Sequence, residues 1–309
     1  MDILINKNLI YTTWDGVEVA PVAFDSLGTR SMATLIMAKS INILIDPGAA
    51  LGPRRYGLPP HPVEYEKLRE HKEKISDVAR ESDIIIITHY HYDHIPRPSE
   101  DISWLARKKL LIKDPHHNIN YSQRMRAGVL LENLKKIDAD VKVVDGRELV
   151  FGKCRLKFSE PVQHGNDSRL GYVLQVSVHE AGEKVIHTSD VEGIVVEEQA
   201  RFIISNMPEV VICDGPMTYM LGDKYSEEDL KKSLNNLKRI VKKTSLEELI
   251  LDHHLTRDRE WRTKLKNFLE ELRDLVEIHT AASYIGIPEQ PLESIRDTLW
   301  KTHKIEEKD

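Results

Sequence analysis

The sequence predicts an α/β protein in which two β-sheets pack together and helices cover their outer sides. Short apolar or alternating runs, which are typical of strands, fall into two groups, at residues 17–88 and 141–213, and helical sequence follows each group. Strand-like runs outnumber helical ones, which favours two packed sheets over one doubly wound parallel sheet. No Gly/Ser-rich linker and no internal repeat divides the 309 residues, so we expect a single domain over residues 1–309.

The individual elements follow from hydrophobic periodicity. Strands are expected at 17–24, 32–38, 41–46, 83–88, 141–144, 148–151, 154–160, 170–178, 184–188, 209–213 and 247–251. Apolar residues recur every three or four positions in 63–80 and 261–272, which predicts two amphipathic helices. Ser226 and Asp229 form a capping-box pattern that starts another helix. A helical C-terminal extension is expected at 280–309.

Composition excludes several classes of protein. Hydrophobic residues are 40% and charged residues 30% of the chain, which excludes disordered and collagen-like sequences. No apolar run approaches the roughly 20 residues that a bilayer requires, so no membrane partner is expected. The net charge of −6 disfavours bulk nucleic-acid binding. The two cysteines, Cys154 and Cys213, suit the core of a cytoplasmic protein.

The segment that carries chemistry follows the apolar strand at 84–87. It reads His89-Tyr90-His91-Tyr92-Asp93-His94, an HxHxDH pattern. Alternate residues of an extended stretch point the same way, so His89 and His91 can bind one ion. Asp93 and His94 can face a second ion where the chain turns, and imidazole and carboxylate suit zinc, manganese or iron.

This pattern resembles the metallo-β-lactamase superfamily, which implies a four-layer αββα sandwich of two mixed β-sheets flanked by helices. Five motifs mark that superfamily, and the chain has a candidate for each. Asp46 ends a strand and resembles the residue that orients the ligand loop without binding metal. His164 resembles the third ligand of the first ion, and Asp190 resembles the carboxylate that bridges both ions.

The fifth motif leaves two alternatives. His253-His254-Leu255-Thr256 aligns best with the Thr-His-Leu-Ser of members that act on phosphodiesters, which makes His254 the ligand of the second ion. His253 then assists the chemistry from the next position, for example as a proton donor. The other alignment makes His253 the ligand.

The resemblance thus implies two divalent ions per chain, Zn²⁺ first, with Mn²⁺ or Fe²⁺ as alternatives. The implied ligands are His89, His91, Asp93, His94, His164, Asp190 and His254. Asp93, His253 and Asp46 complete the set of catalytic candidates. Two such ions lower the pKa of a bridging water toward about 7, so the expected nucleophile is hydroxide.

Departures from the family pattern limit which reactions are expected. His91 stands where oxygen-reducing di-iron members have Glu, and Asp190 stands where β-lactamases have Cys, which disfavours both activities. Ile95-Pro96-Arg97-Pro98 replaces the glycine that many members place after the motif, so the mouth of the site differs.

Substrate class rests on basic residues near the motifs. His116, His117, Arg124 and Arg126 cluster in a polar segment, which either holds a phosphate or is the solvated start of a helix with ordinary surface arginines. Arg169, Arg257 and Arg259 lie near the third and fifth motifs. They indicate a small-molecule or short phosphodiester substrate and therefore phosphoester or phosphodiester hydrolysis. The alternatives are a carboxylic ester, thioester or lactone hydrolase, and a non-catalytic metal-binding protein. The sequence leaves the oligomeric state open.

Overall fold

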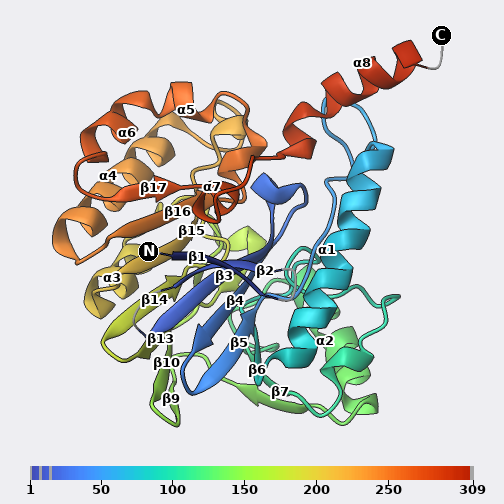
Figure 1. Ribbon diagram of the computed structural model, residues 1–309, viewed down its shortest axis with the longest axis vertical. Helices are drawn as coiled ribbons and strands as arrows, with labels where there is room; N and C mark the ends of the chain where they lie inside the picture. Colours follow the sequence, from blue (N-terminus) through green and yellow to red (C-terminus); the bar gives the residue numbers. More distant parts are fainter. Residues whose placement is uncertain (1, 7–8, 14–15, 307–309) are drawn as a thin grey trace.

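The computed structural model describes residues 2–6, 9–13 and 16–306. Two large β-sheets lie face to face, with helices on both outer sides, so the predicted αββα class is confirmed (Figure 1). The first sheet runs in the order β1 (Asp2–Asn6), β2 (Leu9–Thr13), β3 (Val17–Phe24), β4 (Met32–Ala38), β5 (Ile41–Ile45), β6 (Ile84–Ile87), β7 (Lys109–Ile112) and β8 (Asp140–Val143). Its pairs are antiparallel from β1 to β5 and parallel from β5 to β8.

The second sheet runs in the order β17 (Glu277–His279), β16 (Glu248–Asp252), β15 (Val210–Asp214), β14 (Glu183–His187), β13 (Val176–Glu180), β10 (Cys154–Phe158) and β9 (Glu148–Phe151). Strands β14 to β17 are parallel, and β9, β10, β13 and β14 pair antiparallel. A small hairpin joins β11 (Val162–Gln163) to β12 (Tyr172–Val173). The strands expected at 17–24, 32–38, 41–46 and 83–88 are confirmed within one residue at each end.

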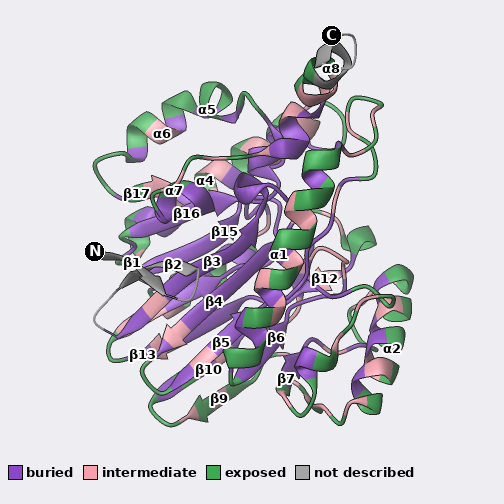
Figure 2. Ribbon diagram, turned by 45° about the vertical axis from the view of Figure 1, so that its right-hand side comes forward, coloured by how far each residue is buried: buried purple, intermediate pink, exposed green. Residues whose placement is uncertain are grey.

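Helices cover the two outer faces. The first sheet carries α1 (Pro62–Glu81) and α2 (Tyr121–Lys136), and the second carries α3 (Glu197–Asn206), α4 (Glu227–Lys243), α5 (Trp261–Lys264) and α6 (Lys266–Leu272). The core between the sheets is apolar, and the helices are exposed mainly on their outer sides (Figure 2). Burying this apolar surface stabilises the fold at roughly 25 cal/mol per Å². Among the described residues, no helix is both long and apolar enough to span a bilayer.

Two helices depart from the sequence expectation. The polar segment for which a helix start was one interpretation does begin a helix, α2, but its full length is not apparent from the sequence, because the exposed Tyr121, Met125 and Val129 obscure the buried face made by Ala127, Leu130 and Leu134. The helix expected at 261–272 is broken at Leu265 into α5 and α6.

Two buried contacts tie the C-terminal segment to the rest of the protein. This segment contains α7 (Ala281–Tyr284), a 3₁₀ turn at Leu292–Ile295 and α8 (Arg296–Glu306). Arg296 donates from Nε and Nη2 to the two carboxylate oxygens of Glu64 at 2.8 and 2.7 Å, and both side chains are 0% exposed. Arg30 pairs in the same bidentate way with Glu293. The C-terminal segment is therefore joined to Glu64 by a fully buried ion pair and to Arg30 by a partly buried one.

Replacing Glu64→Gln should destabilise the protein by about 3–5 kcal/mol, because the buried Arg296 charge loses its counter-charge. Chemical denaturation measures the change in the free energy of unfolding. The matched control is Glu70→Gln, which removes the exposed Glu70–Lys67 pair and should cost less than about 1 kcal/mol. Equal, small effects of both variants would contradict this account of the C-terminal contact.

Candidate metal centre

The candidate site lies where the carboxyl ends of parallel strands from both sheets meet. Asp46 follows β5 and the HxHxDH segment follows β6 in the first sheet, while Asp190 follows β14 and His253 follows β16 in the second. Parallel strands end at the same edge, which is where α/β proteins place their sites. Residues far apart in sequence therefore meet at one edge of the sandwich.

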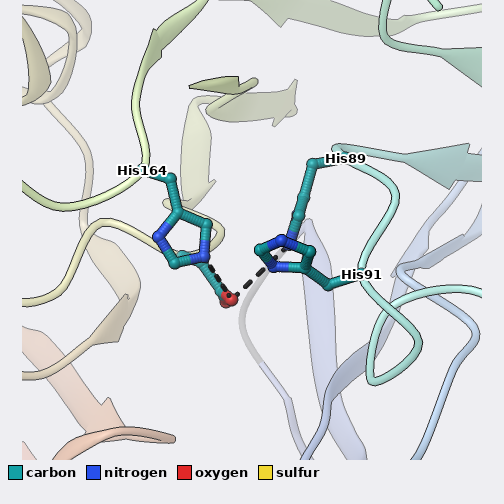
Figure 3. Close-up of side chains that lie close together, drawn as sticks. His89, His91 and His164 are labelled. Atoms are coloured by element: carbon teal, nitrogen blue, oxygen red, sulfur yellow. Dashed lines mark hydrogen bonds and ion pairs between the residues drawn. The ribbon is translucent and has the colours of Figure 1, made fainter. Parts of the chain in front are cut away.

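The first group of ligand-type atoms comes from His89, His91, His164 and Asp190, whose atoms lie within 4.8 Å of one another. Figure 3 shows the three histidines close together, with dashed lines joining one carboxylate oxygen to two of them. This oxygen is Oδ2 of Asp190, 3.1 Å from Nε2 of His164 and 3.5 Å from Nε2 of His89. Three imidazoles and a carboxylate form a donor set of the kind that zinc prefers.

The second group shares Asp190. Its other oxygen, Oδ1, lies 2.9 Å from Nε2 of His94 and 3.3 Å from Nε2 of His253. Asp93 Oδ2 lies 3.8 Å from that same His253 nitrogen, and Asp93, His94 and His253 form one group. One carboxylate therefore lies between two groups of histidines, with a different oxygen toward each.

A buried carboxylate lies behind several of these rings. Nδ1 of His94 is 2.9 Å from Asp46, Nδ1 of His253 is 2.7 Å from Asp25, and Nδ1 of His254 is 2.9 Å from Asp214. Accepting the Nδ1 proton fixes the tautomer and leaves Nε2 as a lone-pair donor. Asp46 also accepts from the Thr88 backbone N–H and hydroxyl, so it holds the loop as the resemblance implies.

Asp25, Asp214 and Glu192 were missed by the sequence reasoning. Glu192 is buried and has an oxygen 3.5 Å from Nδ1 of His164. Asp214 is the last residue of the buried strand β15. An Asp at or just after the end of a buried strand also marks Asp46 and Asp190, so the same pattern predicts Asp214 as a site residue. Asp25 follows the apolar run 17–24, but only the tertiary structure shows that it lies beside His253.

The local electrostatics follow from burial and from these carboxylates. Burial lowers the pKa of His89 to about 4, so this ring is neutral near pH 7. For His164, burial favours the neutral ring, but hydrogen bonds to Asp190 and Glu192 outweigh it and raise the pKa to about 10. Burial raises the pKa of Asp214 to about 7. Proton and metal ion thus compete for the His164 ring.

The donor atoms fit divalent metal ions. Nε2 of His89, Nε2 of His94 and Oδ1 of Asp190 are buried and make no hydrogen bond with any described residue. Buried polar atoms are normally paired, and leaving one unpaired costs about 1–3 kcal/mol. Cations bound between these atoms would satisfy all three.

Both histidines of the fifth motif reach the site, but they lie differently. His253 shares a group with Asp93 and His94, whereas His254 joins only Asp190 and His253. His253 is 0% exposed, and its Nε2 also accepts a hydrogen bond from Arg257 at 3.0 Å. The His254 side chain is 10% exposed and its ring is parallel to that of Tyr219, with 6.5 Å between the centroids.

Of the residues expected to contact substrate, Arg257 lies in the site and the others lie outside the ligand groups. His116, His117 and Arg124 are exposed, their polar partners are Asp114 and the backbone of His116, and no ligand group includes them. Arg257 lies in the site, with Nη2 3.8 Å from Asp93 Oδ2, but it is buried and paired with Asp25 at 2.7 Å. His187 lies outside the ligand groups, because its ring bonds the backbone of Met32 and Ser189.

The fold and its edge of metal-ligating residues define a protein of the metallo-β-lactamase fold. Unliganded yeast PDE1 aligns with a TM-score of 0.52 at 16% identity, covering 86% of this chain and 97% of that one. The metallo-β-lactamase fold protein YhfI from Bacillus subtilis aligns with a TM-score of 0.49 at 16% identity, with the same coverage. At these identities the likeness concerns the fold.

Sequence comparison identifies the family. The chain is 43% identical over 292 residues to the UPF0282 protein of Korarchaeum cryptofilum, covering 94% of this chain and 97% of that protein. It is 41% identical over 300 residues to UPF0282 protein MJ1629 of Methanocaldococcus jannaschii, covering 94% and 99%. The chain belongs to the UPF0282 family. No protein-family model matches it.

We expect the purified protein to hold close to two transition-metal ions per chain, because one carboxylate serves two groups of ligands. Removing them with a chelator should lower the melting temperature, since an ion at 1,000 times its Kd stabilises the folded state by about 4 kcal/mol. Elemental analysis and thermal melts before and after chelation measure both effects. A protein that remains metal-free after incubation with zinc, manganese or iron would contradict the assignment.

Proposed function

We propose that this protein is a metal-dependent hydrolase with two metal ions per chain that cleaves a phosphoester or phosphodiester. The observation that carries the proposal is the position of Asp190, whose two oxygens face the two groups of ligand atoms. Paired sites of this kind are typical of phosphatases and nucleases. When bound, the two ions would activate a water and stabilise the negative charge that develops on the substrate.

The proposed first ion takes His89, His91, His164 and Asp190. For the second we propose Asp93, His94, Asp190 and His253, which departs from the sequence alignment that favoured His254. The reason is geometric, because only His253 shares a group with both Asp93 and His94. His253 has a φ of 57°, a left-handed conformation that takes the chain out of the regular alternation of β16.

The remaining residues then have separate tasks. Asp25, Asp46 and Asp214 accept the Nδ1 protons of His253, His94 and His254 and so orient these rings. His254, partly exposed beside Tyr219, is placed to hydrogen-bond the substrate or its leaving group. Arg257 brings a positive charge within 3.8 Å of Asp93, which suits an anionic substrate better than a neutral ester.

The ligand assignment is tested with two neighbouring variants. His253→Ala should lose about one ion per chain, because it removes a ring shared by the second group. His254→Ala should keep both ions and lose activity. Metal stoichiometry of the folded variants decides between them, and loss of an ion in His254→Ala alone would restore the sequence alignment.

Asp93→Ala should reduce hydrolysis of bis-p-nitrophenyl phosphate by about 10³-fold or more while leaving the fold intact, because this partly buried carboxylate lies in a loop and contributes little to the apolar core. Circular dichroism and turnover of metal-loaded protein separate the two effects. Asp77→Ala, which changes an exposed carboxylate on α1, is the matched control.

The same wild-type preparation is assayed on carboxylic ester, thioester and lactone panels. Faster turnover on one of these panels than on phosphoesters would overturn the proposed substrate class. Metal-loaded protein inactive on every panel would favour a non-catalytic metal-binding protein.

A further inference from the structure

Two arginines lie over the ring of Tyr92, in the middle of the HxHxDH segment. The guanidinium carbons of Arg97 and Arg126 are 4.7 and 4.6 Å from the centroid of this ring. Neither arginine makes an ion pair with a described carboxylate, in contrast to Arg30, Arg257 and Arg296. Two cations held around one ring repel each other, and an anion between them would relieve that repulsion.

These arginines line a hollow between the HxHxDH loop and helix α2. Its walls include Tyr92, Arg97, Ile102, Arg126, Val129 and Asn133. Guanidinium and amide groups donate hydrogen bonds to phosphate oxygens, and the aromatic and aliphatic walls suit an apolar body attached to the phosphate. The hollow therefore has guanidinium donors beside aromatic and aliphatic walls.

Helix α2 fixes the distance from this hollow to the first group of ligands. Gln123 of α2 accepts from the backbone N–H of Tyr90 and has its amide nitrogen 3.4 Å from Nε2 of His91. Arg126 is three residues further along, on the same side of the helix, which is a rise of about 4.5 Å. Its Nη1 lies 3.5 Å from the carbonyl oxygen of Tyr90. The hollow is thus lined by a residue of the same helix that contacts His91, about one turn further along it.

The exposed side of the metal centre faces solvent near the same loop. The Asp93 side chain is 18% exposed, whereas those of His89, His94 and His253 are 0% exposed. Tyr92, the preceding residue, packs partly buried against the apolar cluster between the first sheet and its helices, so the hollow lies on the helix side of the same loop.

We propose that the hollow formed by Tyr92, Arg97 and Arg126 binds a second phosphate of the substrate, so that the substrate is a nucleotide unit with a phosphate on each side of the nucleoside. This inference rests on the proposed phosphoesterase function and adds the substrate class to it. The scissile phosphate lies at the metal centre, the second phosphate lies between the two guanidiniums, and the nucleoside spans the loop. A substrate with a single phosphate binds without these contacts.

The test compares the p-nitrophenyl ester of thymidine 5′-phosphate with and without a 3′-phosphate. On the 3′-phosphorylated substrate, Arg126→Gln should raise KM by about 10- to 100-fold, the value of one or two charge-assisted hydrogen bonds, with kcat little changed. On the ester that lacks the 3′-phosphate, KM should not change. Arg97→Gln, on an exposed residue, should act in the same direction without endangering the fold.

Arg124→Gln is the matched control, because Arg124 is on the same helix but donates to the carbonyl oxygen of His116 instead of lining the hollow. It should leave both KM values unchanged. If Arg97→Gln and Arg126→Gln affect both substrates equally, or neither, the arginines only support Tyr92 and the proposal is wrong.

A binding measurement keeps this inference separate from the proposed function. In isothermal titration, wild-type protein should bind thymidine 3′,5′-bisphosphate about tenfold or more tightly than thymidine 5′-phosphate, and Arg126→Gln should remove the difference. If wild-type protein cleaves no phosphoester but shows this preference, the proposed function fails and the hollow remains an anion site. If it cleaves phosphoesters without the preference, the inference fails alone.

Discussion

At the edge where the two sheets meet, buried carboxylates orient buried histidines, and the rest of the site depends on these contacts. Moving one ion out of water costs several kcal/mol after relaxation, and this edge holds many ionisable groups at once. Each of His94, His253 and His254 has its own carboxylate at Nδ1, from Asp46, Asp25 and Asp214. Because these pairs set the tautomers, the Nε2 atoms of His94 and His253 point toward Asp190 before any cation binds.

Three residues at the strand ends adopt rare backbone conformations that help to place these side chains. Asp46, Ser189 and His253 have φ values of 52°, 59° and 57°, a region that residues other than glycine rarely adopt. Each follows a buried strand, so the strand is rigid and the turn redirects the next side chains into the site. Glycine is also required at position 48, because a Cβ there would lie 2.3 Å from the backbone nitrogen of Ile95 and would displace the HxHxDH loop.

Much of the site could be predicted because its residues follow strands whose pattern is clear in the sequence. The HxHxDH segment, Asp46, His164 and Asp190 all follow or flank apolar runs, and the structure brings them together. Asp25 could not be predicted, because its contact with His253 joins residues 228 positions apart and no local pattern records it. The full length of helix α2 could not be predicted for a different reason, since Tyr121, Met125 and Val129 leave it apolar on its exposed side as well.

The C-terminal segment lies beside the residues that hold the candidate metal centre in place. Asp25 accepts from Arg257 and is close to His253, and Arg257 lines the same small hollow as Arg30, Glu64 and Glu293. Three ion pairs, Asp25–Arg257, Arg30–Glu293 and Glu64–Arg296, meet around this hollow, and removing one partner of a pair leaves the other without its counter-charge. The Asp25–Arg257 pair that holds His253 thus lies beside the Arg30–Glu293 pair of the C-terminal segment. A site assembled this way is held in place by the whole sandwich, which explains how a loop after a four-residue strand can keep its ligands aligned.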